Sequence, residues 1–230
     1  MSLDKTLETI LRSECAHLGT QFTSRGGSTV VAQPSGRRLF AKIESSVEQT
    51  VGEAESLKAM GAALSDDDGK GGEGKLTPEV HASGKSDDGR AYLITDYLDL
   101  KPSISRSGQK VLGQRLAEMH KRGVHPDGRF GFGVATYCGV TGDPELKDLE
   151  QQMRDRLGIM NMFGGFTRDF FDAYHAVIPR TEPYYNERLR LYELYHHLNH
   201  LLMFRGGYRS GAVSIMRSLI QFCDNVDDAK

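Results

Sequence analysis

The chain has 230 residues, with 29 Lys and Arg against 31 Asp and Glu, so its formal net charge is −2. Hydrophobic residues make up 38% and charged residues 26% of the chain, an ordinary balance for a soluble protein. No apolar run approaches the roughly 18 residues that a membrane span needs, so we expect no membrane association. The near-zero charge, without a long Lys or Arg tract, argues against nucleic acid as an obligate partner.

The amino-terminal segment predicts a helix. Apolar residues recur at helical spacing from Leu3 to Leu11, and no basic stretch followed by an apolar one suggests a secretory signal. The three cysteines, Cys15, Cys138 and Cys223, are far apart and form no CxxC pair. Reduced thiols and a cytoplasmic protein are therefore expected.

The next part of the chain changes to strand patterns. Residues 61–75 are rich in Gly and Asp without periodicity, which predicts an exposed loop after a helix. Strands are predicted at residues 20–22, 29–32, 38–43, 80–82 and 91–97, and a helix at 47–60.

Beyond Pro102 the strand signal stops and helical spacing takes over. Asp143 and Pro144 are typical of a helix start, with Asp at the N-cap and Pro in the first turn. Helices are predicted at 108–121, from about 143 to 162, and at 166–175, 186–205 and 211–223. The fold class is therefore α+β: a small antiparallel sheet with one or two helices, then a helical region.

The first group of candidate functional residues follows the order turn, strand, helix. Gly26 and Gly27 permit positive φ, so that backbone amides near Ser28 could face a phosphate. Lys42 stands on the next strand, and Glu53 lies eleven residues later on the following helix. In a kinase such a Lys neutralises phosphates and such a Glu fixes the Lys head. The alternative is an ordinary hairpin and a surface lysine.

A second candidate is the segment after the last predicted strand. A buried strand that emerges into an extended segment before a helical region is where a kinase hinge binds adenine. Asp96, Tyr97 and Leu98 occupy that position. The alternative is a simple interdomain linker.

Several longer segments then carry a specific resemblance. The chain resembles the fructosamine/ketosamine-3-kinase family, in family order, from about residue 20 to residue 220. The matching segments are those around Lys42 and Glu53, together with Leu116–Gly123, Gly131–Thr141, Met162–Phe166, Ala173–Pro179, Arg188–His200 and Arg205–Met216.

The resemblance implies a protein-kinase-like, aminoglycoside-phosphotransferase-like fold with two lobes. Residues 1–100 would form the lobe with the Gly-rich loop and hinge, and residues 101–230 a truncated helical lobe. The family uses ATP and Mg²⁺ to phosphorylate the 3-hydroxyl of ketosamines on glycated proteins or small molecules, and the product sheds its sugar. The expected cofactor-binding residues are those singled out above, and the sequence does not fix the number of subunits.

The chain departs from the family pattern where chemistry is expected. The family's catalytic loop supplies a catalytic Asp and a metal-binding Asn, and a following Asp-Pro supplies a metal-binding Asp. Neither motif appears between Thr141 and Leu157, which indicates a deletion of several tens of residues. No catalytic residue or metal ligand is therefore assigned, and weak or no kinase activity is expected. The alternative function is a nucleotide- or partner-binding pseudokinase.

Two motifs could substitute for the missing ones, and both are weak. Asp127 follows His125 in a His-x-Asp order, but Phe132 stands where an Asn is needed five residues on. Asp143 precedes Pro144, but helix capping explains that pair better and no strand is predicted before it.

The helical part raises two further expectations. His196, His197 and His200 share a helix, and packing is a simpler role for them than metal binding because no Cys or carboxylate completes a set. Removal of the missing segment should also expose apolar side chains of the same helix. The leucines expected at that face are Leu189, Leu191, Leu194, Leu198 and Leu201.

Overall fold

The computed structural model describes residues 2–64, 76–123, 133–138, 141–143, 157–158, 160 and 162–227. Contacts divide the chain into two compact units. The sheet unit comprises Met1–Ser103 and Phe132–Leu146, and the helical unit comprises Ile104–Gly131 and Lys147–Lys230. The units are defined by contacts, and the assignment of residues 1–100 and 101–230 to two functional lobes stays a prediction.

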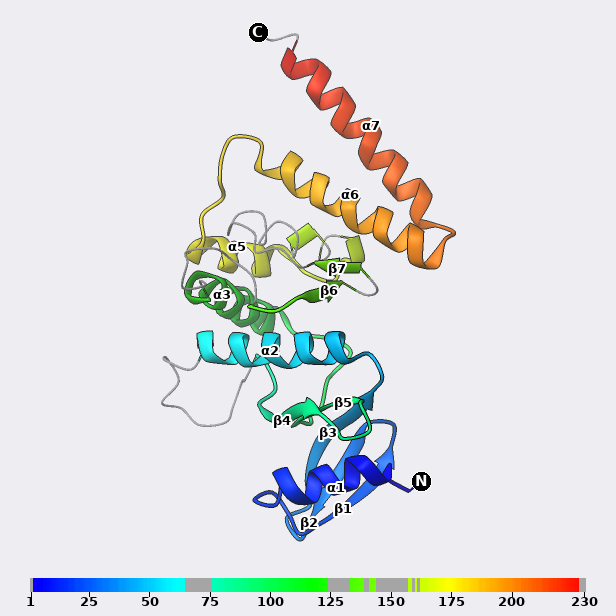
Figure 1. Ribbon diagram of the computed structural model, residues 1–230. Helices are drawn as coiled ribbons and strands as arrows, with labels where there is room; N and C mark the ends of the chain where they lie inside the picture. Colours follow the sequence, from blue (N-terminus) through cyan, green and yellow to red (C-terminus); the bar gives the residue numbers. More distant parts are fainter. Residues whose placement is uncertain are drawn as a thin grey trace. The chain divides into compact units, whose positions relative to one another are not determined.

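The sheet unit contains a five-stranded antiparallel sheet in the order β1-β2-β3-β5-β4 (Figure 1). All five predicted strands form. Strand β1 extends to Gly26, through residues that the sequence assigned to a turn, because Gly26 still pairs with Thr29. The strands are β1 (Gln21–Gly26), β2 (Thr29–Gln33), β3 (Arg37–Glu44), β4 (Val80–Lys85) and β5 (Ala91–Asp96).

The two faces of this sheet have different neighbours. Side chains alternate along a strand, so Leu39 and Ala41 of β3 belong to the buried apolar core, together with residues of helix α1 (Lys5–Glu14). Phe40 lines a cleft and Lys42 contacts helix α2 (Val47–Leu64), both on the other face. One face is therefore structural and the other is available to a ligand.

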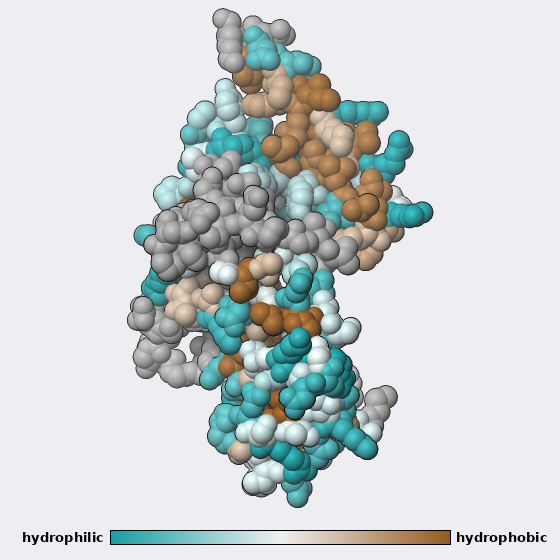
Figure 2. All heavy atoms as spheres, viewed as in Figure 1, coloured by the Kyte–Doolittle hydropathy of each residue, from teal (hydrophilic) through white to brown (hydrophobic). Residues whose placement is uncertain are grey.

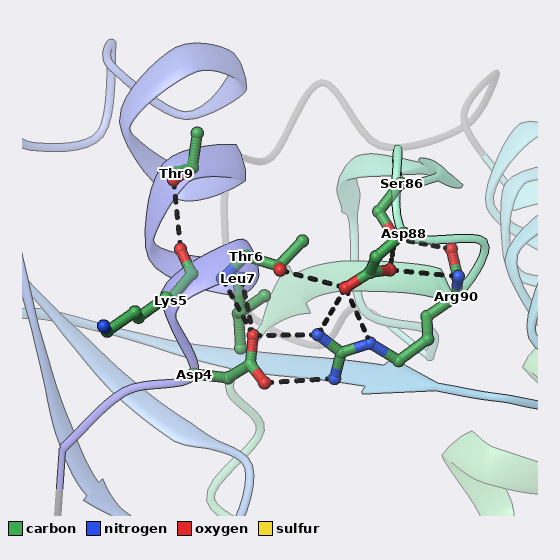
Figure 3. A network of polar contacts seen from close by, with 8 residues as sticks. All are labelled: Asp4, Lys5, Thr6, Leu7, Thr9, Ser86, Asp88 and Arg90. Atoms are coloured by element: carbon green, nitrogen blue, oxygen red, sulfur yellow. Dashed lines mark hydrogen bonds and ion pairs between the residues drawn. The ribbon is translucent and has the colours of Figure 1, made fainter.

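Helix α1 is the amphipathic helix that the sequence predicts. Its apolar residues Leu7, Ile10 and Leu11 are buried in the core of the sheet unit. Its N-cap Asp4 accepts hydrogen bonds from the backbone N–H groups of Thr6 and Leu7. Figure 3 shows that the same carboxylate also accepts hydrogen bonds from the guanidinium of Arg90, the residue just before β5. The cap thus also anchors the helix to the sheet.

Helix α2 begins at Val47 as predicted and continues to Leu64, beyond the predicted end at Met60. It contacts β4 and β5, and also a two-stranded hairpin of β6 (Thr136–Cys138) and β7 (Thr141–Asp143). The expectation that strands end at Pro102 is therefore wrong. Each of these strands has only three residues, too few for a period-two pattern to be recognised in sequence.

The same hairpin changes the interpretation of Asp143, before which no strand is predicted. A strand does precede it, since Asp143 is the last residue of β7 and pairs with Thr136. The helix predicted after Pro144 lies mostly outside the described residues, although Leu157, Gly158 and Met160 are helical. His125–Asp127 also lie outside them, as do residues 65–75 of the loop predicted at 61–75. Residues 61–64 of that predicted loop belong to helix α2 instead.

The helical unit has a small core between helices α3 (Arg106–Arg122) and α5 (Arg168–Val177). Gly113 of α3 allows this packing, because a Cβ there would lie 2.3 Å from the carbonyl oxygen of Phe170. The hydroxyl of Tyr174 and Nδ1 of His120 form a buried hydrogen bond of 2.8 Å. The core residues are Ala117, Leu157, Phe170, Tyr174, Tyr185 and Leu189.

Helices α6 (Tyr185–Phe204) and α7 (Tyr208–Asp227) form an antiparallel pair with a large exposed apolar surface. Figure 2 shows apolar side chains gathered over these two helices. Of the twenty residues of α7 only Ala212 and Ile215 are buried. Among the described residues, no helix is both long and apolar enough to cross a membrane.

Candidate nucleotide-binding site

The β1–β2 connection supplies the Gly-rich turn. Gly26 and Gly27 have φ of 105° and 52°, in the left-handed region that favours glycine. A Cβ at either position would meet nothing within 4 Å, so backbone conformation and not crowding requires the glycines. The carbonyl of Ser28 accepts a hydrogen bond from the N–H of Ala41, which joins the turn to strand β3.

Lys42 and Glu53 form the ion pair that their order in the sequence predicts. Lys42 is on β3 opposite Leu93 of β5, and Glu53 is on α2. Nζ of Lys42 donates to Oε2 of Glu53 at 2.5 Å. The two side chains are 20% and 45% exposed, so the pair contributes no more than about 1 kcal/mol to stability. Its importance lies in fixing where a positive charge stands.

The segment after β5 is held at its first residue. The carboxylate of Asp96 accepts hydrogen bonds from Arg37 at 2.7 Å and from the N–H of Glu79 at 3.2 Å, and its contact with Nε2 of His81 is 2.9 Å. Burial pushes the pKa of Asp96 upward, but the hydrogen bonds from Arg37 and His81 outweigh burial and hold the pKa at about 2.

The Asp96 side chain is thus ionised and engaged within the protein. Its backbone N–H also donates to the carbonyl of Glu79, and its own carbonyl accepts from the hydroxyl of Thr95. Tyr97 packs under the guanidinium of Arg38, 4.4 Å from the ring centroid. The carbonyl of Leu98 accepts from the N–H of Leu100. Asp96 therefore shapes this segment, and the residues after it form the cleft wall.

These elements surround one cleft of about 540 Å³ within the sheet unit. This volume is in the usual range for small-molecule sites, and the walls combine apolar side chains with a few polar ones. Five of the eight predicted residues line it: Ser28, Glu53, Asp96, Tyr97 and Leu98. Gly26 and Gly27 form the adjacent turn, and Lys42 contacts Glu53, which lines the cleft.

Other lining residues escaped the sequence reasoning. They are Thr29, Phe40, Leu57, Pro78, Leu93, Thr95, Asp99 and Leu100. The spacing of residues along a strand or a helix could have identified some of them. Phe40 lies two residues before Lys42 and Leu57 four residues after Glu53, so each shares a face with a residue already singled out.

A metal-binding group is not among the described residues. No three His, Cys, Asp or Glu side chains gather there as a cation site. The histidines of α6 make other contacts: Nδ1 of His200 lies 2.9 Å from the carbonyl of His196, and His197 packs closely against Gly211. Among the described residues, none is therefore assigned as a ligand of Mg²⁺.

The fold defines an α+β, protein-kinase-like protein. A crystal structure of a candidate fructosamine-3-kinase from Thermobifida fusca YX-ER1 superimposes with a TM-score of 0.72 at 15% identity, covering 95% of this chain and 100% of that one. The family model of fructosamine kinases matches residues 24–149 and 151–222. The chain belongs to the fructosamine kinase family.

Two relatives add detail. Mouse ketosamine-3-kinase is 51% identical over 63 residues, covering 27% of this chain and 20% of the mouse protein. The chloroplastic protein-ribulosamine 3-kinase of Arabidopsis thaliana is 28% identical over 298 residues, covering 94% of this chain and 87% of the plant protein. The plant alignment is longer than this chain of 230 residues, so part of the plant protein has no counterpart here.

Proposed function

We propose that the chain binds ATP in the cleft of the sheet unit and descends from enzymes that phosphorylate ketosamines. The observation that carries the proposal is the Lys42–Glu53 ion pair beside a cleft lined by the predicted hinge. Lys42 would neutralise the α- and β-phosphates, with Glu53 holding its ammonium group. The turn at Gly26, Gly27 and Ser28 would present amides to phosphate oxygens.

The substrate class follows from the relatives. The mouse relative is named for ketosamines and the plant relative for protein-bound ribulosamine, so glycated proteins or small ketosamines are the proposed partners. For a chain that still transfers phosphate, the proposed role is deglycation repair in the cytoplasm, with ATP and Mg²⁺ as cofactors.

A second function, a pseudokinase that binds nucleotide without transferring phosphate, is favoured by the shape of the family match. That match breaks at residue 150, inside the stretch where the catalytic-loop motifs are missing from the sequence. Phosphoryl transfer relies on metal ions that bridge the β- and γ-phosphates, and the motifs that hold them are absent. We therefore propose that binding persists while transfer is weak or lost.

The test separates binding from transfer. Titration with ATP should show binding to the wild-type chain, and Lys42→Ala should weaken it about tenfold through loss of the phosphate contact. Lys58→Ala is the matched control, because Lys58 is on α2 and pairs with Glu55 at the surface. Equal affinity of Lys42→Ala and wild type, or no ATP binding at all, would reject the proposed site.

Transfer is then measured with a glycated lysine, ATP and Mg²⁺. Turnover below about 1 s⁻¹, the low end for kinases, is expected. Faster turnover would mean that this chain supplies its own catalytic and metal-binding carboxylates.

A further inference from the structure

The β6–β7 hairpin contacts the helix that carries Glu53. The hydroxyl of Tyr137 on β6 donates a hydrogen bond of 2.8 Å to Oε2 of Glu48. This hydrogen bond raises the pKa of the Tyr137 hydroxyl, which keeps it protonated and able to donate. Glu48 lies in the first turn of α2, so the hairpin is attached near the start of the helix.

A second contact lies one turn further along α2. Gly52 is buried, and a Cβ at its position would be 2.5 Å from the carbonyl oxygen of Ala135, just before β6. No side chain fits in that space, so only glycine allows the helix and the hairpin to approach so closely. Because Glu48 and Gly52 are four residues apart, they share one face of α2.

The face next to it belongs to the cleft. Glu53 and Leu57, also four residues apart, both line the cleft, and Glu53 holds Lys42. Gly52 and Glu53 are sequence neighbours on a hydrogen-bonded helix, so a shift or rotation of α2 that moves one must move the other. The position of the hairpin against Gly52 is therefore coupled to the position of the Glu53 carboxylate.

We propose that the β6–β7 hairpin sets the position of helix α2, with Tyr137 and Gly52 as positioning residues for the Lys42–Glu53 pair. The consequence for nucleotide binding rests on the function proposed above, whereas the consequence for the ion pair does not. The two are therefore tested with separate measurements.

Glycine substitutions give an opposed pair of expectations. In an unobstructed helix, alanine is favoured over glycine, so a Gly→Ala substitution by itself should stabilise the helix. Gly52→Ala must instead displace α2 or the hairpin. Gly61→Ala on the same helix is the matched control, because its Cβ would meet only Oγ1 of Thr77 at an ordinary 3.7 Å. Tyr137→Phe is the milder variant, since it removes one hydroxyl and keeps the ring.

The first measurement needs no ligand. The rate at which an amine-acylating reagent labels Lys42, read by mass spectrometry, reports whether its ammonium is held by Glu53. Gly52→Ala should raise the labelling rate towards that of Glu53→Gln, and Tyr137→Phe should raise it by about twofold to threefold. Gly61→Ala should leave it unchanged.

The second measurement is the affinity for ATP. Gly52→Ala should weaken binding about tenfold and Tyr137→Phe about threefold, and neither should have a further effect in a chain that already carries Glu53→Gln. Unchanged labelling of Lys42 in both variants would overturn the inference. Failure of the wild-type chain to bind ATP would instead reject the proposed function, leaving the labelling result to decide on the hairpin.

Discussion

The sheet unit and the helical unit bury their apolar residues to very different degrees. Helix α1 and one face of β3 share a buried core, in which Leu11, Leu39 and Ile94 are fully buried. In the helical unit, Leu202 of α6 is 77% exposed and Ile220 of α7 is 60% exposed. A helix is stable mainly through the apolar face that it buries, so the helical unit should be the weaker of the two.

The plant relative indicates a reason for this difference. Its alignment extends over more residues than this chain possesses, and the family match breaks at residue 150, within the range assigned to the helical unit. The expected exposure of α6 is confirmed for Leu191 and Leu198, at 54% and 42%, and is wrong for Leu189, which packs into the core. Leu194 and Leu201 are half-buried.

The largest expected effect is that the two units unfold at different temperatures. Calorimetry should show the helical unit melting first, below about 60 °C, within the range of mesophilic domains. An apolar dye such as ANS should bind the wild-type chain before that transition, because the α6–α7 surface is already exposed. A single sharp transition above about 60 °C without dye binding would show that the units are equally stable.

A core substitution should act on the sheet unit alone. Leu39→Ala removes a fully buried side chain, so the free energy of unfolding of that unit should fall by about 2–5 kcal/mol. Leu202→Ala, at an exposed position, should change stability by no more than about 0.5 kcal/mol. Urea unfolding measures both, and similar losses for the two variants would contradict the comparison.

The helical unit can be tested at its tightest contact. Gly113→Ala places a Cβ against the backbone of Phe170, so the lower transition should lose about 1–3 kcal/mol despite the better helix propensity of alanine. Val111→Ala, on the same helix but exposed, is the control. If Gly113→Ala raises the temperature of the lower transition, α3 and α5 are not packed as described.

The smallest effect concerns acid. Hydrogen bonds from Arg90 lower the pKa of both Asp4 and Asp88 (Figure 3). Because these pKa values are lowered in the folded state, the carboxylates add stability above the unfolded value of about 3.9 and lose that contribution as the pH falls below it.

Arg90→Ala should therefore flatten the acid dependence of the upper transition below about pH 4. Arg12→Ala is the control, since Arg12 pairs with Glu8 at the surface of the same unit. If wild type and Arg90→Ala lose stability equally steeply as the pH falls, other groups cause the acid sensitivity.

The sequence by itself determined the five strands, six helices and the Lys42–Glu53 pair, because each depends on local spacing or on a short sequence separation. Alternation along β3 placed Lys42 opposite the core, and helical periodicity placed Glu53 within reach of it. The family motifs also predict a nucleotide-binding cleft.

Tertiary structure alone decided how α2 is covered. The sequence pattern predicts an apolar face through Val47, Val51, Ala54 and Leu57, with Lys58 at its edge. Ala54 is indeed buried, but Val47, Val51 and Leu57 are only half-buried, whereas Thr50 and Gly52 are buried. The hairpin that covers Gly52 comes from more than eighty residues later, in strands too short for a readable period. This contact joins two segments that are far apart in the sequence. Local periodicity describes only one segment at a time, so it cannot show which residues a distant segment will cover.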